Sequence, residues 1–254
     1  MHFELQRADM WKRIAAAVLD LILLCVVATG MMVLMSLVTG YDGYVEKMEG
    51  YYVSYAEAYG IESFDITQDT YNSYTEEERA RYDAAANALS EDKDVLRVYS
   101  MVLSLTVLNT TLAIFIAYLI MEFALPMILK NGQTLGKKIF ALGVVRCDGV
   151  KVTPLMMFVR TVLGKFTVET MVPVMLIVML LFNIVGIVGI VVIAALLIFQ
   201  IVLLTVNRNR TVIHDAFAQT VVIDLPSQKI FDTAEDLLAY KTKLAAERAA
   251  EADY

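Results

Sequence analysis

Acidic side chains inside long apolar segments are the residues of this sequence best suited to chemistry. Asp20 is the sole charged residue between Ile14 and Leu37. That run is long enough, as a helix, to cross a hydrocarbon core of about 30 Å. A carboxylate inside such a span costs about 2.5–3.5 kcal/mol, so Asp20 predicts a functional site. The alternative is an acid that only holds neighbouring helices together.

A second acid occupies a comparable position. Glu122 lies in the apolar segment 101–129, eight residues before Lys130, and Asp20 lies seven residues after Arg13. If the first span enters the membrane on the side where the second leaves it, both carboxylates lie at about the same depth. Facing carboxylates could bind a cation or share a proton, because two like charges are costly to hold together in a low dielectric. The alternative is that Glu122 meets a different neighbour or extends toward water.

Other polar residues could complete this site. Arg13 and Asp20 share one face of a helix because they are seven residues apart, and Asp215 could pair with Arg13 instead. Glu169, near the start of the third span, and Asn109, in the polar middle of the second, are secondary candidates. We therefore predict an ion- and proton-coupling site among these side chains.

The apolar segments indicate an integral membrane protein with four transmembrane helices. Hydrophobic residues make up 58% of the chain, which is typical of this class. The first apolar run is too long for the core of a cleaved signal peptide, so an uncleaved span is expected. The block 166–206 is too long for one span and is predicted to hold two, at 167–183 and 186–206, with Asn183 and Gly186 in the reversal; one long broken helix is the alternative.

The segments between the spans differ sharply in charge. Segment 39–99 holds 14 acids and 5 bases and many tyrosines, whereas 130–165 holds seven bases and one acid. The predicted organisation is a first span at 1–38, an external acidic helical insert at 39–99, a second span at 100–129, a basic cytoplasmic loop with a β-hairpin and an interfacial helix at 130–165, the third and fourth spans at 166–206, and a cytoplasmic strand and helix at 207–254.

Local signals predict the elements of the insert and the loops. Thr75 and Glu78 have the spacing of a capping box, so the insert is expected to contain two or three short helices with a solvated acidic face. Asp148-Gly149 lies between alternating segments and predicts a hairpin, which strand 219–224 could extend. A helix at 154–164 is expected to lie along the membrane interface.

The distribution of basic residues predicts the topology. Four spans put both termini on one side, together with the basic 130–165 loop, Lys12, Arg13, Arg208 and Arg210. The positive-inside rule makes that side the cytoplasm and puts the 39–99 insert outside the cell membrane. The loop 132–138 is interpreted as a turn with basic membrane anchors, since it lacks the spacing of a phosphate-binding loop. Its bases are expected to attract anionic lipid.

Several function classes are disfavoured by the composition. Two histidines and two cysteines without metal-ligand spacing predict no metal site, and no nucleophile–base pair or cofactor motif indicates an enzyme. The net charge of −7 disfavours nucleic acid as a partner. The expected partners are lipids, monovalent cations and protons, and further copies of the chain, because one four-span chain encloses little pathway.

Short motifs in a fixed order resemble the RDD family of bacterial membrane proteins. The family is named for an arginine that opens the first span, an aspartate within it and an aspartate after the last span, matching Arg13, Asp20 and Asp215. A glycine-containing loop matches 132–138, and residues 214–220 match the pattern H-D-x-x-A-G-T, with Gln219 in place of the usual glycine. The resemblance covers about 10–38 and 100–224 and leaves out the insert and the tail.

The resemblance implies a helical membrane fold more firmly than an activity. Transport of unidentified ligands has been suggested for the family, and sodium/proton antiport is associated with some members. A secondary transporter or cation/proton antiporter that uses the membrane carboxylates is therefore one hypothesis. A membrane module that senses, scaffolds or assists assembly is the alternative, and the surroundings of Asp20 and Glu122 distinguish the two.

Overall fold

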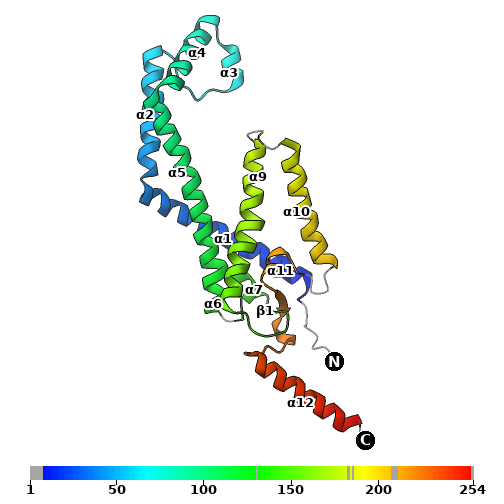
Figure 1. The fold of residues 1–254 in the computed structure, drawn as a ribbon. Helices are drawn as coiled ribbons and strands as arrows, with labels where there is room; N and C mark the ends of the chain where they lie inside the picture. The colour runs from blue at the N-terminus through cyan, green and yellow to red at the C-terminus, as the bar shows by residue number, and fades with distance from the viewer. Residues whose placement is uncertain (1–7, 130, 182–183, 185, 207–210, 253–254) are drawn as a thin grey trace. The chain divides into compact units, whose positions relative to one another are not determined.

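The computed structural model describes residues 8–129, 131–181, 184, 186–206 and 211–252. Within them, four helical stretches are long and apolar enough to cross a membrane. This confirms the predicted helical membrane protein with four candidate spans (Figure 1). The stretches are α1 (Met10–Thr39); α5 (Lys93–Tyr118) continued by the π-helix η1 (Leu119–Ala124) and α6 (Leu125–Ile128); α8 (Pro154–Phe158) continued by the π-helix η2 (Val159–Met171) and α9 (Val172–Leu181); and α10 (Gly186–Val206).

The separate interfacial helix expected at 154–164 is not present. Thr153 caps the start of the helix, since its hydroxyl accepts a hydrogen bond from Met156 N at 3.3 Å. The helix then continues without a break to Leu181, because Gly164 packs against another element and does not end it. The helix that holds the predicted third span therefore begins at Pro154 and not near residue 167.

The third and fourth spans are two separate helices, α9 and α10. They pack side by side, which disfavours the single broken helix (Figure 1). Gly186 opens α10 with a φ of 47°, a left-handed conformation that glycine adopts without strain. Asn183, the other residue predicted for this reversal, lies outside the described residues.

Residues 28–114 form one of two compact units of the chain. Besides the adjoining parts of α1 and α5, the unit contains α2 (Tyr41–Tyr59), α3 (Gln68–Ser73) and α4 (Glu76–Glu91), as the sequence predicted. The capping box is confirmed, because Glu78 N donates to the Thr75 hydroxyl at 3.3 Å and Thr75 N donates to Glu78 Oε2 at 2.8 Å. Met48, Leu89 and Val95 form a small core of this unit.

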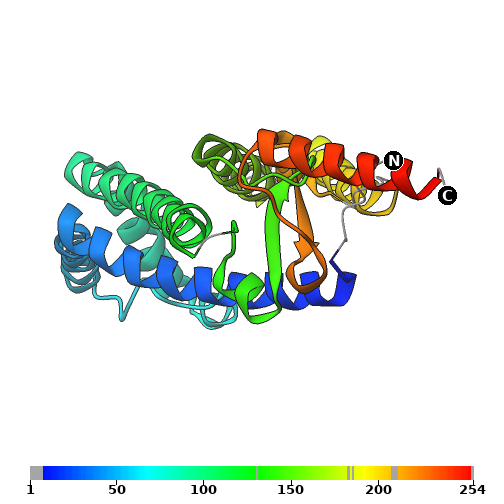
Figure 2. The same ribbon diagram turned by 90° about the horizontal axis from the view of Figure 1, so that it is seen from below.

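The other compact unit consists of residues 1–27 and 115–254. Its sheet pairs β1 (Leu142–Arg146) with β2 (Thr220–Asp224) in antiparallel register, with Leu142 opposite Asp224 (Figure 2). The predicted Asp148-Gly149 turn forms, but the returning strand of the hairpin is reduced to a bridge between Val145 and Lys151. The predicted strand 219–224 is therefore the main partner of β1.

Short elements of the same unit connect the sheet to the spans. They are α7 (Leu135–Ile139) and α11 (Ile213–Phe217), whereas η3 (Leu225–Ser227) and α12 (Ala234–Ala252) follow the sheet. Leu142, Val144 and Val222 of the sheet pack against Ala16 of α1. The sheet thereby fixes α7 and α11 near the end of α1 that carries Arg13 and Asp20.

Candidate functional site

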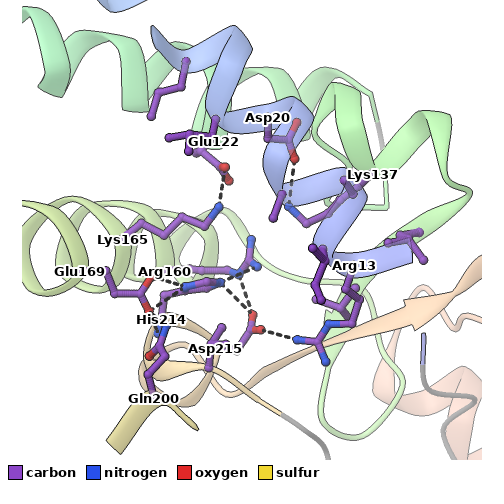
Figure 3. Close-up of a pocket in the computed structure, with 18 of the residues that line it drawn as sticks. Arg13, Asp20, Glu122, Lys137, Arg160, Lys165, Glu169, Gln200, His214 and Asp215 are labelled. Carbon is purple, nitrogen blue, oxygen red and sulfur yellow. Dashed lines mark hydrogen bonds and ion pairs between the residues drawn. The ribbon is translucent and has the colours of Figure 1, made fainter. Parts of the chain in front are cut away.

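A cavity of about 390 Å³ lies within the unit formed by residues 1–27 and 115–254. Ionisable side chains line it from α1, the two π-helices, α7 and α11 (Figure 3). The acidic ones are Asp20, Glu122, Glu169 and Asp215, and the basic ones are Arg13, Lys137, Arg160 and Lys165, with His214 beside them. Such groups are rare in membrane-embedded protein, and they mark functional sites there.

The two π-helices carry four of these side chains. Glu122 lies in η1, and η2 carries Arg160, Lys165 and Glu169. The Thr161 hydroxyl donates to the backbone oxygen of Glu122 at 2.9 Å and so joins the two π segments. Because π-helical segments occur frequently at functional sites, their position at this cavity supports a functional assignment.

Asp20 is held by the loop that enters α7. Its carboxylate accepts hydrogen bonds from the Thr134 hydroxyl at 2.5 Å and from Gly136 N at 2.8 Å, and Lys137 Nζ lies 3.7 Å away. A Cβ atom on Gly136 would lie 2.4 Å from the backbone oxygen of Ala16. Glycine is therefore needed for α7 to approach α1 closely enough to bind Asp20.

The interpretation of this loop as a membrane anchor is wrong for Lys137. Lys137 is buried, with 8% of its surface exposed, whereas the adjacent Lys138 is exposed. Burial lowers the pKa of the Lys137 ammonium to about 8, although the nearby Glu122 carboxylate opposes this shift. Lys137 therefore titrates much closer to neutral pH than an ordinary lysine.

Glu122 has a different lysine as its partner. Lys165 Nζ contacts Glu122 Oε1, while Oε2 has no hydrogen-bond partner among the described residues. Asp20 and Glu122 thus line the same cavity, but each carboxylate has its own ammonium group. The hypothesis of two carboxylates that share one proton is not supported, because the positive charges of Lys137 and Lys165 compensate them.

Asp215 and Arg160 form a fully buried ion pair. Arg160 Nε lies 2.8 Å from Asp215 Oδ1, and the two side chains are 1% and 0% exposed. The Thr220 hydroxyl donates to the same oxygen at 2.9 Å. Arg13 Nη2 lies 3.9 Å from Asp215 Oδ2, which confirms the predicted alternative in which Arg13 pairs with Asp215.

His214 connects this ion pair to Glu169. His214 Nδ1 lies 2.8 Å from Glu169 Oε2, and Arg160 Nη2 lies 3.1 Å from His214 Nε2. Burial lowers the pKa of His214, so the ring is neutral at pH 7, and it donates from Nδ1 to Glu169 while Nε2 accepts from Arg160. A Cβ on Gly164 would lie 2.5 Å from His214 Cβ, so this glycine allows α11 to pack on η2.

The structure brings together most, but not all, of the predicted site residues. Asn109 lies elsewhere, in the unit of residues 28–114, where its amide donates to the Thr39 hydroxyl at 3.0 Å. Sequence reasoning counted Lys137, Arg160 and Lys165 only as cytoplasmic bases. The signal that could have found two of them is the spacing of Arg160, Lys165 and Glu169, which recur every four or five residues in a helical segment.

The comparison with protein families agrees with this site. The model of the RDD family matches residues 7–219. The chain belongs to the RDD family. The arginine and two aspartates on which the resemblance rested all line the cavity of this RDD protein. No curated protein and no solved structure was found to match the chain.

Gln219, which replaces the usual glycine of the H-D-x-x-A-G-T pattern in this RDD protein, has a strained backbone. Gln219 has a φ of 52°, in the left-handed region where a side chain costs roughly 1–2 kcal/mol. Gln219→Gly is therefore expected to stabilise the protein by up to about 1 kcal/mol, because glycine removes the strain but gains entropy when unfolded. Thermal unfolding in detergent measures this, and a lower melting temperature would contradict it.

Proposed function

We propose that this RDD protein is a secondary transporter that exchanges a monovalent cation for a proton at the carboxylates of the cavity. The observation that supports this most is the convergence of buried acids and bases from different membrane spans on one cavity. Asp20 and Glu122 are only 6% and 5% exposed. Holding such groups in a membrane is costly, which favours a role in moving charge over simple helix packing.

Lys137 is the proton-carrying group in this proposal. Below about pH 8 its ammonium is protonated and balances Asp20, as Lys165 balances Glu122. When Lys137 loses its proton, the two carboxylates carry one more negative charge than their surroundings compensate, and a cation can bind. Return of the proton to Lys137 expels the cation, so one monovalent cation moves for each proton. Because one chain encloses little pathway, the transporter would be a homo-oligomer.

Lys137→Gln is expected to lower coupled exchange at least about tenfold, since it removes the titrating ammonium and its charge-assisted contacts. Lys138→Gln is the matched control, because Lys138 is exposed and should leave exchange unchanged. The measurement is dissipation of a pH gradient by sodium, potassium or lithium in proteoliposomes, on both sides of pH 8. If folded, correctly oriented wild-type protein shows no cation-dependent flux, the proposed exchange is contradicted. If Lys137→Gln retains the flux of wild type, Lys137 is not the proton-carrying group.

The proposed orientation puts both termini in the cytoplasm of a cell-membrane protein and residues 39–99 outside. Cys147 is exposed on the cytoplasmic side in this proposal, and Glu62 is exposed in the insert. In a Cys25→Ser background, an impermeant thiol reagent should label Glu62→Cys in intact cells. Native Cys147 should react only after the cells are opened. The reverse pattern would contradict the orientation.

The alternative function is a non-transport membrane module that senses or scaffolds. The observation that favours it is the insert, which folds around a hydrophobic core of its own within the unit 28–114. Such a folded, acidic body outside the membrane is suited to contact a partner. The flux experiment separates the two functions, because a scaffold needs no cation-dependent movement of protons.

A further inference from the structure

We propose that the cavity binds a small zwitterion, a molecule that carries a primary ammonium group and an oxyanion on an apolar body. The inference rests on the proposed function only in taking the cavity as the ligand site. It adds the chemical class of an organic ligand, which an exchange of inorganic cations does not require.

Three buried polar atoms in the lining are incompletely used. Glu122 Oε2, Asp215 Oδ2 and Arg160 Nη1 have no hydrogen-bond partner among the described residues. The other polar atoms of these side chains are engaged: Glu122 Oε1 with Lys165, and Asp215 Oδ1 with Arg160 Nε and Thr220. Asp215 Oδ2 has Arg13 Nη2 only at 3.9 Å, which is beyond hydrogen-bond distance.

A ligand that carries both charges would satisfy all three atoms. An ammonium group has three donors and can serve the two carboxylate oxygens, and an oxyanion can accept from Arg160 Nη1. An inorganic cation would serve the carboxylates and leave the guanidinium donor unpaired, and an anion would do the reverse. An unsatisfied buried donor or acceptor is costly, so a ligand with both groups fits the site better than either ion.

The size and walls of the cavity also favour an organic ligand. About 390 Å³ is within the range of small-molecule sites and far exceeds the roughly 30 Å³ that one water occupies. Apolar side chains also line the cavity: Ile14, Leu21, Leu24, Leu142, Val212 and Val222. Ile14 and Leu21 are 45% and 57% exposed on a candidate membrane span, so the apolar lining continues onto a surface that lipid would contact.

The same chemistry occurs in a free amino acid and in the headgroup of phosphatidylethanolamine. The test therefore uses L-leucine, with two analogues that each lack one charge: 3-methylbutylamine lacks the carboxylate, and 4-methylpentanoate lacks the ammonium. Binding to the full chain in detergent is measured by calorimetry. A second arm measures retention of phosphatidylethanolamine against phosphatidylcholine in nanodiscs, because the choline headgroup has no N–H donor.

Leucine should bind at least about tenfold more tightly than either analogue, or phosphatidylethanolamine should be retained over phosphatidylcholine by a similar factor. The first result identifies a free ligand and the second a lipid. Equal binding of leucine and the amine, without selective lipid retention, would overturn the inference, because Arg160 would then have no part. No binding in either arm would also overturn it.

Two variants connect binding to the cavity. Glu122→Gln should weaken the favoured zwitterion at least about tenfold, whereas Glu57→Gln on the exposed face of α2 should not. If Glu122→Gln does not fold, Ala17→Leu fills the cavity from α1, and Val18→Leu is its control because Val18 is 52% exposed. Unchanged binding in Ala17→Leu would overturn the assignment to this cavity.

The failures of this inference and of the proposed function are distinguishable. Cation flux without zwitterion binding would support the proposed exchange and contradict the organic ligand. Zwitterion binding without cation flux would contradict the exchange and support the ligand site.

Discussion

Asp215→Asn is expected to lower the free energy of unfolding by about 3–5 kcal/mol, the usual cost of removing one partner of a buried ion pair. Arg160 would be left buried with its charge uncompensated, since it is only 1% exposed and Asp215 Oδ1 is 2.8 Å from its Nε. Arg13 would lose its ion pair with Asp215 in the same step. The measurement is thermal and denaturant unfolding in detergent.

Asp224→Asn is the control for this loss. Asp224 also pairs with a base, Lys12, at 2.9 Å, but the Lys12 side chain is 47% exposed. Exposed ion pairs contribute little, so Asp224→Asn should cost far less than Asp215→Asn. Equal losses in the two variants would contradict the larger cost that burial is expected to give the Asp215–Arg160 pair.

The pH dependence of stability should separate Asp215→Asn from wild type. Burial opposes ionisation of Asp215, but the charge and the hydrogen bond of Arg160, together with the charge of Arg13, hold the pKa of that carboxyl well below its ordinary value of 3.8. Because the folded pKa is the lower one, the stabilisation is fully present above 3.8 and is lost as the pH falls below that value. The acid-induced loss should therefore be smaller in the variant than in wild type.

Asp20→Asn is expected to reduce cation/proton exchange at least about tenfold while the protein remains folded. Asparagine keeps an oxygen that can accept from Gly136 N but loses the charge that faces Lys137, and charge-assisted hydrogen bonds are worth about 1.5–3 kcal/mol. The measurement is pH-gradient dissipation in proteoliposomes. Asp148→Asn is the control, because Asp148 pairs with Arg146 at a partly exposed turn.

The effects of Asp20→Asn and Lys137→Gln should not add. Residues that share one network couple, so the double variant should lose little more exchange than either single variant. Additive losses would mean that the two residues act separately. Exchange that survives Asp20→Asn unchanged would keep the transporter and exclude Asp20 from its mechanism.

The sequence alone determined the features that depend on local pattern. Runs of apolar residues predicted the spans, because any helix of that length and polarity prefers the bilayer. Thr75 and Glu78 predicted a helix start, since a capping box needs only residues three positions apart. The acids Asp20 and Glu122 stood out for the same reason: their neighbours in sequence are apolar, so their burial followed from the span itself.

Partners of those acids were decided only by the tertiary structure. Asp20 meets Thr134 and Lys137, which lie more than a hundred residues away in the sequence. Helical spacing says which residues of one helix share a face, but it does not say which face of another helix meets them. The π-helical turns of η2 bring Arg160, Lys165 and Glu169 to one cavity, whereas ordinary α-helical spacing would put Arg160 and Glu169 on opposite faces.

The close approach of short helices to the long helices decided which charged side chains of the cavity are in contact. Lys137 and Lys138 are adjacent and chemically identical, yet only Lys137 is buried beside an acid. This follows from Gly136, whose missing side chain lets α7 contact Ala16 and Asp20, just as Gly164 lets α11 place His214 and Asp215 against η2. The sequence supplied the charges, and the packing that these two glycines permit determined which charges meet, because charges interact strongly only at short distance and away from water.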